Sequence, residues 1–407
     1  MLGRASALLW ACLPLLLPAQ DPSGLIFGEV TTIDEACYTG VIRWGAEEAF
    51  WDDLFIATKA RSVGLDYLSG DELKRLYDRQ REQRIDWSFM SLWEQPYPDL
   101  KHAFRCRFGD IRSLRVMGDQ RVLLMLKDGS LLDIAEGPDV GQWVYVYDPD
   151  NVPTRVDWDR IHTITFLPTP PQWYKTPVRA LYGTVFTTQG AFSGHIIWDD
   201  QAGLSTDLLE GKSAKGTLSI PYGDIEELRA EGDGLRVRTF GGKDYLLSGT
   251  DETGPNNHGI IVKSLLLGHV RIAWEQFSFA RFARENPGTG PAYEAFRPPR
   301  LLSGTIRTID GQALQGHLLY DIDESMDFEV IEGRQDGIYY SIPICNIARI
   351  ERRNHKFCAV ILRNGDKLFL GEEHDVTDDN WGVLVWDGGK RPRYLAWNTL
   401  ESIEFDP

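Results

Sequence analysis

The chain has 407 residues, a mass of 46.2 kDa and a formal net charge of −17 at pH 7. With 43% hydrophobic residues, it is long enough for two to four domains with sizeable cores. Because so acidic a protein repels polyanions, the charge argues against general nucleic-acid binding and against attachment to anionic lipid.

Residues 1–20 are typical of a secretory signal peptide. They contain one positive charge, Arg4, then an apolar run that is broken by Pro14, and the small residue Ala19 near the end. The run is too short for a comfortable membrane span, and no later apolar run is long enough either. We therefore expect a secreted or periplasmic protein without a transmembrane segment. Lipid attachment at Cys12 is the alternative outcome of the same leader.

Three long repeats follow the leader. We place them at residues 21–168, 180–283 and 301–407, and the linkers at 169–179 and 284–300 are rich in proline and glycine. Within each repeat, a glycine begins an alternating strand and an aromatic residue ends it four positions later. These pairs are Gly40 with Trp44, Gly194 with Trp198, and Gly316 with Tyr320. Such alternation between glycine turns predicts β-hairpins, and hence an all-β protein.

Each repeat also contains two copies of a closing pattern, so we divide it into two small barrel-like half-units. In one copy, Val156, Trp158, Ile161 and Ile164 supply the apolar positions. In the other copies of the pattern, the position equivalent to Trp158 is occupied by Trp274, Trp397, Phe108, Tyr222 and Ile344. The spacing predicts a strand, a one-turn corner and a returning strand with alternate residues inward. The tryptophans of this pattern are therefore expected in the core.

The first repeat carries an insertion at about residues 62–103, which is the only strongly helical part of the sequence. Ser69 is expected to cap a helix, with Glu72 three residues later. Beyond this helix lies an aromatic cluster that includes Trp87, Phe89 and Trp93. Two interpretations remain open: the insertion caps an open barrel end, or it is a recognition element.

Each half-unit resembles the small SH3-like and Sm-like barrels. The resemblance rests on the strand from Gly194 to Asp199 and on the corner formed by Ile220, Pro221 and Tyr222. The Sm signature spaces its glycine and aromatic one residue further apart, and no specific family covers the whole chain. Because these folds serve many unrelated roles, mostly in binding, the resemblance informs the architecture and says little about function.

Two features could indicate a disulfide framework or a metal site. The cysteines that follow the leader are Cys37, Cys106, Cys345 and Cys358. They either pair within their repeats or are buried free thiols, and their spacing matches no metal knuckle. The acidic run from Asp321 to Glu332 has the oxygen spacing of a calcium loop, but Met326 stands where that loop needs glycine. We interpret it as a solvated acidic hairpin and expect neither a metal nor a cofactor.

Other polar residues recur at equivalent places in the repeats. His195 and His317 occupy a strand position that is valine in the first repeat, which indicates a packing position. Asp53, Asp207 and Glu329 recur nine residues beyond the strand-ending aromatic. One carboxylate per repeat, without a partner acid or base, indicates a turn or edge-strand role.

The sequence therefore predicts an exported, non-enzymatic binding or scaffolding protein whose ligand is a protein or a glycan. It has no nucleophile elbow, zinc-protease motif, phosphate loop or dinucleotide glycine pattern. Aromatic residues that the repeat does not require are the candidate binding residues: Trp51, Trp87, Phe89 and Trp93. The alternative is a hydrolase acting on an envelope polymer, with carboxylates at a cleft between domains.

Overall fold

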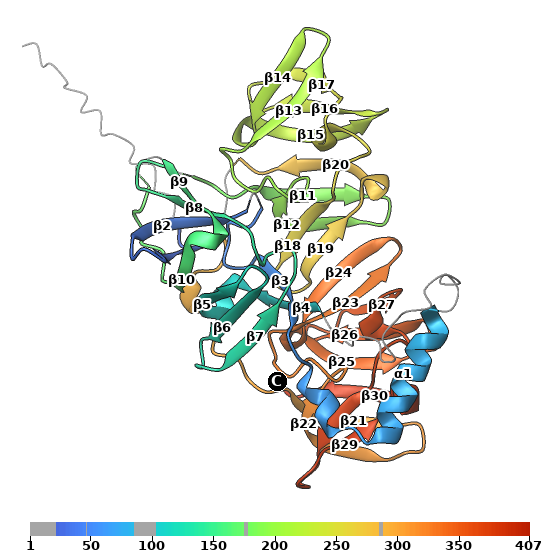
Figure 1. The fold of residues 1–407 in the computed structure, drawn as a ribbon. Coiled ribbons are helices and arrows are strands. Elements are labelled where there is room, and N and C mark those ends of the chain that lie inside the picture. The colour runs from blue at the N-terminus through green and yellow to red at the C-terminus, as the bar shows by residue number, and fades with distance from the viewer. Residues whose placement is uncertain (1–21, 46, 85–102, 175–177, 285–287) are drawn as a thin grey trace, which may run out of the picture.

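The computed structural model describes residues 22–45, 47–84, 103–174, 178–284 and 288–407 (Figure 1). The described chain is almost entirely antiparallel β-sheet, with a single α-helix, α1 (Gly70–Arg84). None of the described helices has the length and apolar character that a membrane span requires.

Each repeat contributes ten strands to the described chain. Repeat 1 contains β1 (Phe27–Thr32), β2 (Cys37–Trp44), β3 (Leu54–Lys59), β4 (Ala103–Arg107), β5 (Ile111–Gly118), β6 (Arg121–Leu126), β7 (Leu131–Ala135), β8 (Val144–Tyr147), β9 (Pro153–Val156) and β10 (Ile161–Phe166). Repeat 2 contains β11 (Tyr182–Thr187), β12 (Ala191–Ile197), β13 (Leu208–Ser213), β14 (Gly216–Pro221), β15 (Ile225–Glu231), β16 (Gly234–Thr239), β17 (Asp244–Leu247), β18 (Ile260–Ser264), β19 (Gly268–Ile272) and β20 (Phe277–Phe282). Repeat 3 contains β21 (Ser303–Thr308), β22 (Ala313–Leu319), β23 (Val330–Gln335), β24 (Ile338–Pro343), β25 (Ile347–Arg352), β26 (Phe357–Leu362), β27 (Lys367–Gly371), β28 (Val383–Trp386), β29 (Arg393–Leu395) and β30 (Leu400–Phe405).

The strands pair in the same way in all three repeats. In repeat 1 the order across the sheet is β4-β3-β7-β6-β5-β10-β1-β2-β8-β9. The corresponding strands of repeats 2 and 3 make the same pairings, except that β13 meets β17 only through the bridge between Lys212 and Ser248. The all-β fold class predicted from the sequence is confirmed.

The two half-units of a repeat exchange strands. The sheet order of repeat 1 is symmetric about the pairing of β5 with β10, so the repeat has two five-stranded lobes. One lobe consists of β1 and β2 from the first half of the sequence with β8, β9 and β10 from the second, and the other lobe has the complementary set. Each lobe therefore contains strands from both halves of its repeat. The half-units of the sequence analysis were contiguous stretches of chain, so they do not correspond to the lobes.

The predicted closing corners are present in all six positions as one-turn 3-10 helices. They are Phe108–Asp110, Trp158–Arg160, Tyr222–Asp224, Trp274–Gln276, Ile344–Asn346 and Trp397–Thr399. The strand pairing shifts register directly after each corner, which is a β-bulge that lets the returning strand curve over the core. Trp158, Trp274 and Trp397 are at most 9% exposed, so the expectation that they belong to the core is confirmed.

The recurring carboxylates close turns, as expected, and also join the repeats. In repeat 1, Asp53 Oδ2 accepts hydrogen bonds from the backbone N–H groups of Ala49 and Phe50. Asp207 and Glu329 accept the equivalent pairs of backbone hydrogen bonds in repeats 2 and 3. The second oxygen of each carboxylate binds a cation from another repeat.

These cations are Lys263, Arg43 and Lys59. Lys263 Nζ lies 2.9 Å from Asp53 Oδ1, and Lys59 Nζ lies 2.6 Å from Glu329 Oε1. Arg43 Nη1 lies 2.9 Å from Asp207 Oδ1. Repeat 1 is thus tied to both of the other repeats by ion pairs at equivalent turns.

The insertion packs against repeat 3 (Figure 1). Ser69 and Glu72 form the predicted capping box at the start of α1. Leu68 and Leu76 contribute to a small apolar cluster, whose other buried members are Leu319, Ile322, Trp381 and Leu384 of repeat 3. The described part of the insertion therefore covers a face of another repeat instead of the end of its own.

We predict that Lys263 is the most sensitive of these cations to substitution. Its side chain is 2% exposed, and it contacts both Asp52 and Asp53. The change Lys263→Met leaves these carboxylates buried without their cation, so the free energy of unfolding should fall by ~3–5 kcal/mol. Urea unfolding of the full chain measures the change.

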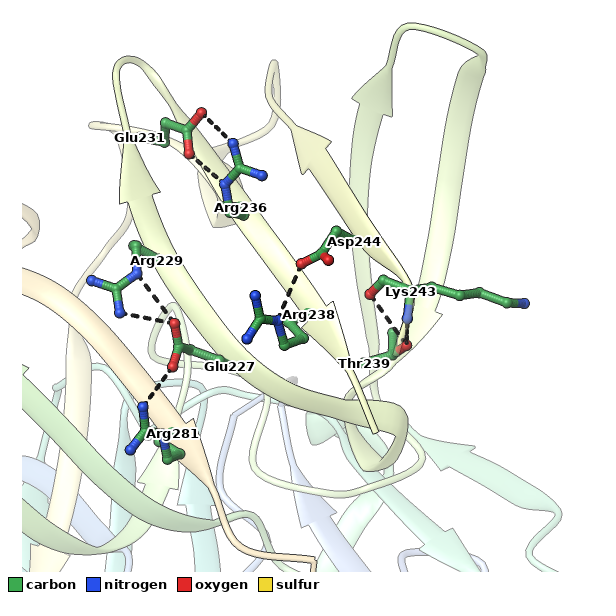
Figure 2. Close-up of polar contacts among 9 residues, drawn as sticks. All are labelled: Glu227, Arg229, Glu231, Arg236, Arg238, Thr239, Lys243, Asp244 and Arg281. Carbon is green, nitrogen blue, oxygen red and sulfur yellow. Dashed lines mark hydrogen bonds and ion pairs between the residues drawn. The ribbon is translucent and has the colours of Figure 1, made fainter. Parts of the chain in front are cut away.

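The matched control is Arg236→Met on the outer face of repeat 2. Figure 2 shows Arg236 paired with Glu231. The two side chains are 46% and 42% exposed. Because solvent screens such a pair, the control should cost less than ~1 kcal/mol. Equal losses in the two variants would contradict the importance of the buried pair.

Candidate functional site

A cavity of about 470 Å³ lies where the three repeats meet. Repeat 1 contributes Glu47, Glu48, Asp53, Leu54, Ile56, Arg105, Pro138 and Asp139. Repeat 2 contributes Ile197, Asp200, Ile261, His269 and Arg271, and repeat 3 contributes Glu332, Arg334, Tyr339, Ser341 and Glu373. The volume falls within the range of small-molecule sites, and the lining is unusually rich in charged side chains.

A strand pair between repeats 2 and 3 builds one wall of the cavity. In the antiparallel pairing of β19 with β24, Arg271 stands opposite Tyr339 and His269 stands opposite Ser341. Because alternate residues of a strand face the same side, these four side chains share a face of the joined sheet. His269 is held in place by a hydrogen bond between its Nε2 and the Asp52 carbonyl, 2.8 Å away.

The arginines of the cavity are paired with carboxylates. Arg271 Nη1 lies 2.8 Å from Asp200 Oδ2, and Arg334 Nε lies 2.8 Å from Glu373 Oε1. These two pairs belong to repeats 2 and 3 respectively. Each holds a donor group and an acceptor group in a defined place at the cavity surface.

A third pair crosses between repeats. Arg105 Nη1 of repeat 1 lies 2.6 Å from Glu332 Oε2 of repeat 3. Tyr339 donates its hydroxyl hydrogen to the other oxygen of Glu332. These contacts fix the positions of the side chains without a ligand, which lowers the entropy cost of binding one.

Three acids of repeat 1 complete the lining. Burial raises the pKa of the Glu48 carboxyl well above its usual range, and the charges of Asp139 and Asp53 raise it further. Burial also raises the pKa of Asp139 to about 7, although a hydrogen bond from the Ile56 backbone N–H opposes this shift. Burial, followed by the charge of Asp200, raises the pKa of Glu47. No cation of the described chain forms an ion pair with Glu47 or Glu48.

Asp139 has a structural role that its equivalents share. Its Oδ2 accepts a hydrogen bond from Ile56 N at 2.5 Å, and its backbone carbonyl accepts one from Trp44 Nε1 at 3.0 Å. Glu252 in repeat 2 and Asp375 in repeat 3 make the same two contacts with their own strands. A shifted carboxyl pKa at this position is therefore a property of the fold in all three repeats. In repeat 1 the carboxyl group also lines the cavity.

The structure places the predicted binding residue Trp51 in the interior. Trp51 is 0% exposed, and its ring centroid lies 4.5 Å from that of Tyr293. Its Nε1 donates to Thr169 Oγ1 at 3.2 Å. The expectation that Trp51 offers an exposed ring is wrong, because both linkers fold back over repeat 1 and bury it. Trp87, Phe89 and Trp93 lie outside the described residues.

The remaining polar candidates differ in outcome. The four described cysteines are free thiols, and Cys106 and Cys358 are buried. His317 is exposed, whereas His195 is partly buried beside Tyr182. The acidic run from Asp321 is not a solvated hairpin: Asp321, Asp323, Glu324 and Glu329 are all at most 7% exposed. Burial follows from the docking of repeat 1, whose Lys59 reaches into this run.

Apart from Asp53 and Glu332, sequence reasoning missed the charged residues that line the cavity. Differences between equivalent positions of the three repeats could have identified some of these residues. The backbone of Trp44 contacts that of Glu48, as Trp198 contacts Ala202 and Tyr320 contacts Glu324, so these positions correspond. An acid where another repeat has alanine is a sign of a specialised position. The meeting of such positions in one cavity depends on how the repeats dock.

Comparisons with known proteins do not assign the chain to a family. No family model matches the sequence, and no curated protein matches it either. The crystal structure of virginiamycin B lyase from Staphylococcus aureus is similar over 74% of this chain and 85% of its own, with 12% identity and a TM-score of 0.13. A likeness this weak carries no argument about fold or function.

We predict that Asp139 makes stability depend on pH. Its folded pKa of about 7 lies above the ordinary value of 3.8, so the folded state keeps a proton that the unfolded state has released. The stability that it contributes is complete below pH ~4 and is lost as the pH rises through ~7. Asp139→Asn keeps an acceptor for Ile56 and should flatten this decline by a few kcal/mol, on the order of 1–4.

Urea unfolding at steps between pH 4 and pH 8 measures this difference. Asp133→Asn is the control, because Arg121 already lowers the pKa of the Asp133 carboxyl and its titration falls below this window. Parallel stability curves for the wild type and Asp139→Asn would contradict the assignment.

Proposed function

We propose that this chain is an exported, non-enzymatic binding protein whose ligand enters the cavity between the three repeats. A cavity that all three repeats line, with side chains held in place by ion pairs, is the observation that supports this function. Export is proposed from the sequence of residues 1–20, which lie outside the described residues.

The chemistry of the lining favours a glycan over a protein surface. A cavity of about 470 Å³ has room for one or two sugar rings or a few side chains, and not for a folded partner. Paired arginines and carboxylates offer fixed donors and acceptors, which suits a ligand with many hydroxyl groups. Glu47 and Glu48 form no ion pair within the described chain, so their carboxyl groups offer a ligand further hydrogen-bonding partners.

A hydrolase that uses Glu48 and Asp139 is the second candidate. Both carboxyls line the cavity and both have raised pKa values, as a general acid requires. The binding function is preferred because Asp139 has structural equivalents in the other repeats. Repeat 3 also has the equivalent acid pair, Glu324 and Asp375, yet that pair does not line this cavity.

Glycan-array screening of the full chain tests the binding function. We expect binding to weaken ~2- to 10-fold in both Glu47→Gln and Tyr339→Phe, because the first change replaces a carboxyl oxygen with an NH2 donor and the second removes a hydroxyl group from the cavity. Glu231→Gln, on the exposed face of repeat 2, should leave binding unchanged (Figure 2).

A second set of variants distinguishes the cavity from the insertion. Trp87→Ala combined with Trp93→Ala should matter only if the aromatic cluster of the insertion contacts the ligand. Loss of binding in this variant, with full binding by Glu47→Gln and Tyr339→Phe, would move the proposed site to the insertion. Selective capture of basic peptides instead of glycans would overturn the ligand class.

Release of reducing ends from polysaccharides by the purified chain tests the hydrolase. If catalysis occurs, Glu48→Gln should lower the rate by at least ~100-fold, because an amide cannot donate the proton of a general acid. A preparation that binds a polysaccharide without cleaving it supports the binding function.

A further inference from the structure

An open hollow of about 330 Å³ lies on repeat 1, apart from the cavity between the repeats. Its lining comes from repeat 1 alone and consists of Asp119, Gln120, Gly141, Trp143, Arg155, Asp157, Trp158 and Asp159. No residue lines both the hollow and the cavity, although the loop between β7 and β8 borders each of them. The volume lies at the lower end of the range of small-molecule sites. The hollow is therefore a second place where a ligand could bind.

Trp143 is specific to repeat 1. It directly precedes β8, and the strand registers of β18 with β19 and of β28 with β29 place Gly259 and Gly382 at the same position in the other repeats. Both glycines have a positive φ, 119° and 100° respectively, so the backbone there is not built for a side chain. The repeat pattern therefore does not require an aromatic ring at this position.

The indole N–H of Trp143 has no acceptor. Two tryptophans line the hollow, and Trp158 Nε1 donates to the Gly118 carbonyl at 3.2 Å. Trp143 Nε1 is buried and has no hydrogen-bond partner among the described residues. A buried donor without an acceptor is unfavourable, so an oxygen of a ligand in the hollow would supply a missing contact.

An arginine and an aspartate hold polar groups beside this indole. The guanidinium carbon of Arg155 lies 4.5 Å from the ring centroid of Trp143, and Arg155 Nε donates to Asp157 Oδ1 at 2.8 Å. Asp157 is also specific to repeat 1, because Ala273 and Ala396 precede the equivalent corners of repeats 2 and 3. These contacts orient the side chains before a ligand arrives, which lowers the entropy cost of binding.

The chemistry of the lining selects among ligands. Three aspartates face one arginine across the hollow, so a negatively charged ligand is repelled. The carboxylates accept hydrogen bonds from hydroxyl groups, and the guanidinium and the indole N–H donate them. The indole also presents a flat apolar surface, on which the C–H face of a ring can pack. A ring that carries hydroxyl groups and no negative charge matches all of these features.

We propose that the hollow bounded by Trp143, Arg155 and Asp157 binds a single uncharged sugar residue. The sugar ring packs on the indole, one of its oxygens accepts the hydrogen bond of Trp143 Nε1, and its hydroxyl groups bond to Arg155 and Asp157. This site is separate from the cavity between the repeats and does not depend on the function proposed for that cavity. It gives repeat 1 a glycan contact that repeats 2 and 3 lack.

Nuclear magnetic resonance of the full chain with ¹⁵N-labelled tryptophan tests this site. The indole N–H signal of Trp143 is identified by its absence from Trp143→Phe. Glucose, galactose, mannose and N-acetylglucosamine are the probes, and glucuronic acid and glucosamine are their charged counterparts. We expect at least one uncharged sugar to move the signal downfield, because the N–H gains an acceptor, with a Kd on the order of 1 mM. Glucuronic acid should bind more weakly than glucose.

Two variants keep the Trp143 signal and locate the sugar. Asp157→Ala introduces the residue of the other repeats at an exposed position, so it should fold normally and weaken sugar binding ~2- to 10-fold. Phe279→Ala is the matched control in repeat 2, where the guanidinium carbon of Arg229 lies 4.3 Å from the Phe279 ring centroid. Sugar binding should survive this change.

The proposal is overturned if no uncharged sugar moves the Trp143 signal, or if glucosamine alone among the probes moves it. It is also overturned if Asp157→Ala binds as tightly as the wild type, or if Phe279→Ala weakens binding as much as Asp157→Ala does. Glycan binding that Glu47→Gln weakens, without movement of the Trp143 signal, would overturn this site and leave the function of the cavity standing.

Discussion

Three ion pairs between repeats, each on a carboxylate that also closes a turn, are the interactions on which the assembled structure depends. Asp53, Asp207 and Glu329 each use one oxygen to accept two backbone hydrogen bonds within their own repeat. The other oxygen binds a cation of a different repeat. Since the carboxylate is already fixed by its turn, little side-chain entropy is lost when the cation binds, and the pair sets the orientation of one repeat against the next.

Lys263 illustrates why these pairs form despite burial. Burial alone would lower the pKa of its ammonium group, but the charges of Asp52 and Asp53 more than compensate, so that its pKa is raised. The Nζ also lies 4.1 Å from the ring centroid of Phe50. The cation is thus surrounded by two carboxylates and an aromatic face, which offsets the cost of removing it from water.

The proposed binding cavity follows from the same organisation. Strand pairing and corners are nearly identical in the repeats, so the residues that differ between equivalent positions are the ones free to take on a function. Tyr339 and Arg105 meet at the cavity because repeats 1, 2 and 3 converge there. The proposed binding cavity therefore depends on docking between repeats.

The sequence by itself determined the all-β class, the repeated glycine-to-aromatic strands and the corner of each closing unit. These features arise from local spacing: alternation of apolar residues, glycine at turns, and an aromatic such as Trp397 at a corner that must face the core. The hydrogen bonds of a hairpin or a corner join residues that are close in the chain. A short stretch of sequence is therefore enough to specify them.

Only the tertiary structure decided which residues are accessible and which come together. Trp51 looked free of the repeat pattern, yet Tyr293 of a distant linker covers it. The acidic run that begins at Asp321 looked solvated, yet Lys59 of repeat 1 enters it. The exchange of strands between half-units is equally invisible in the sequence, because either partner strand would satisfy the same alternation. Such contacts are set by the docking of large surfaces, and no local periodicity encodes that docking.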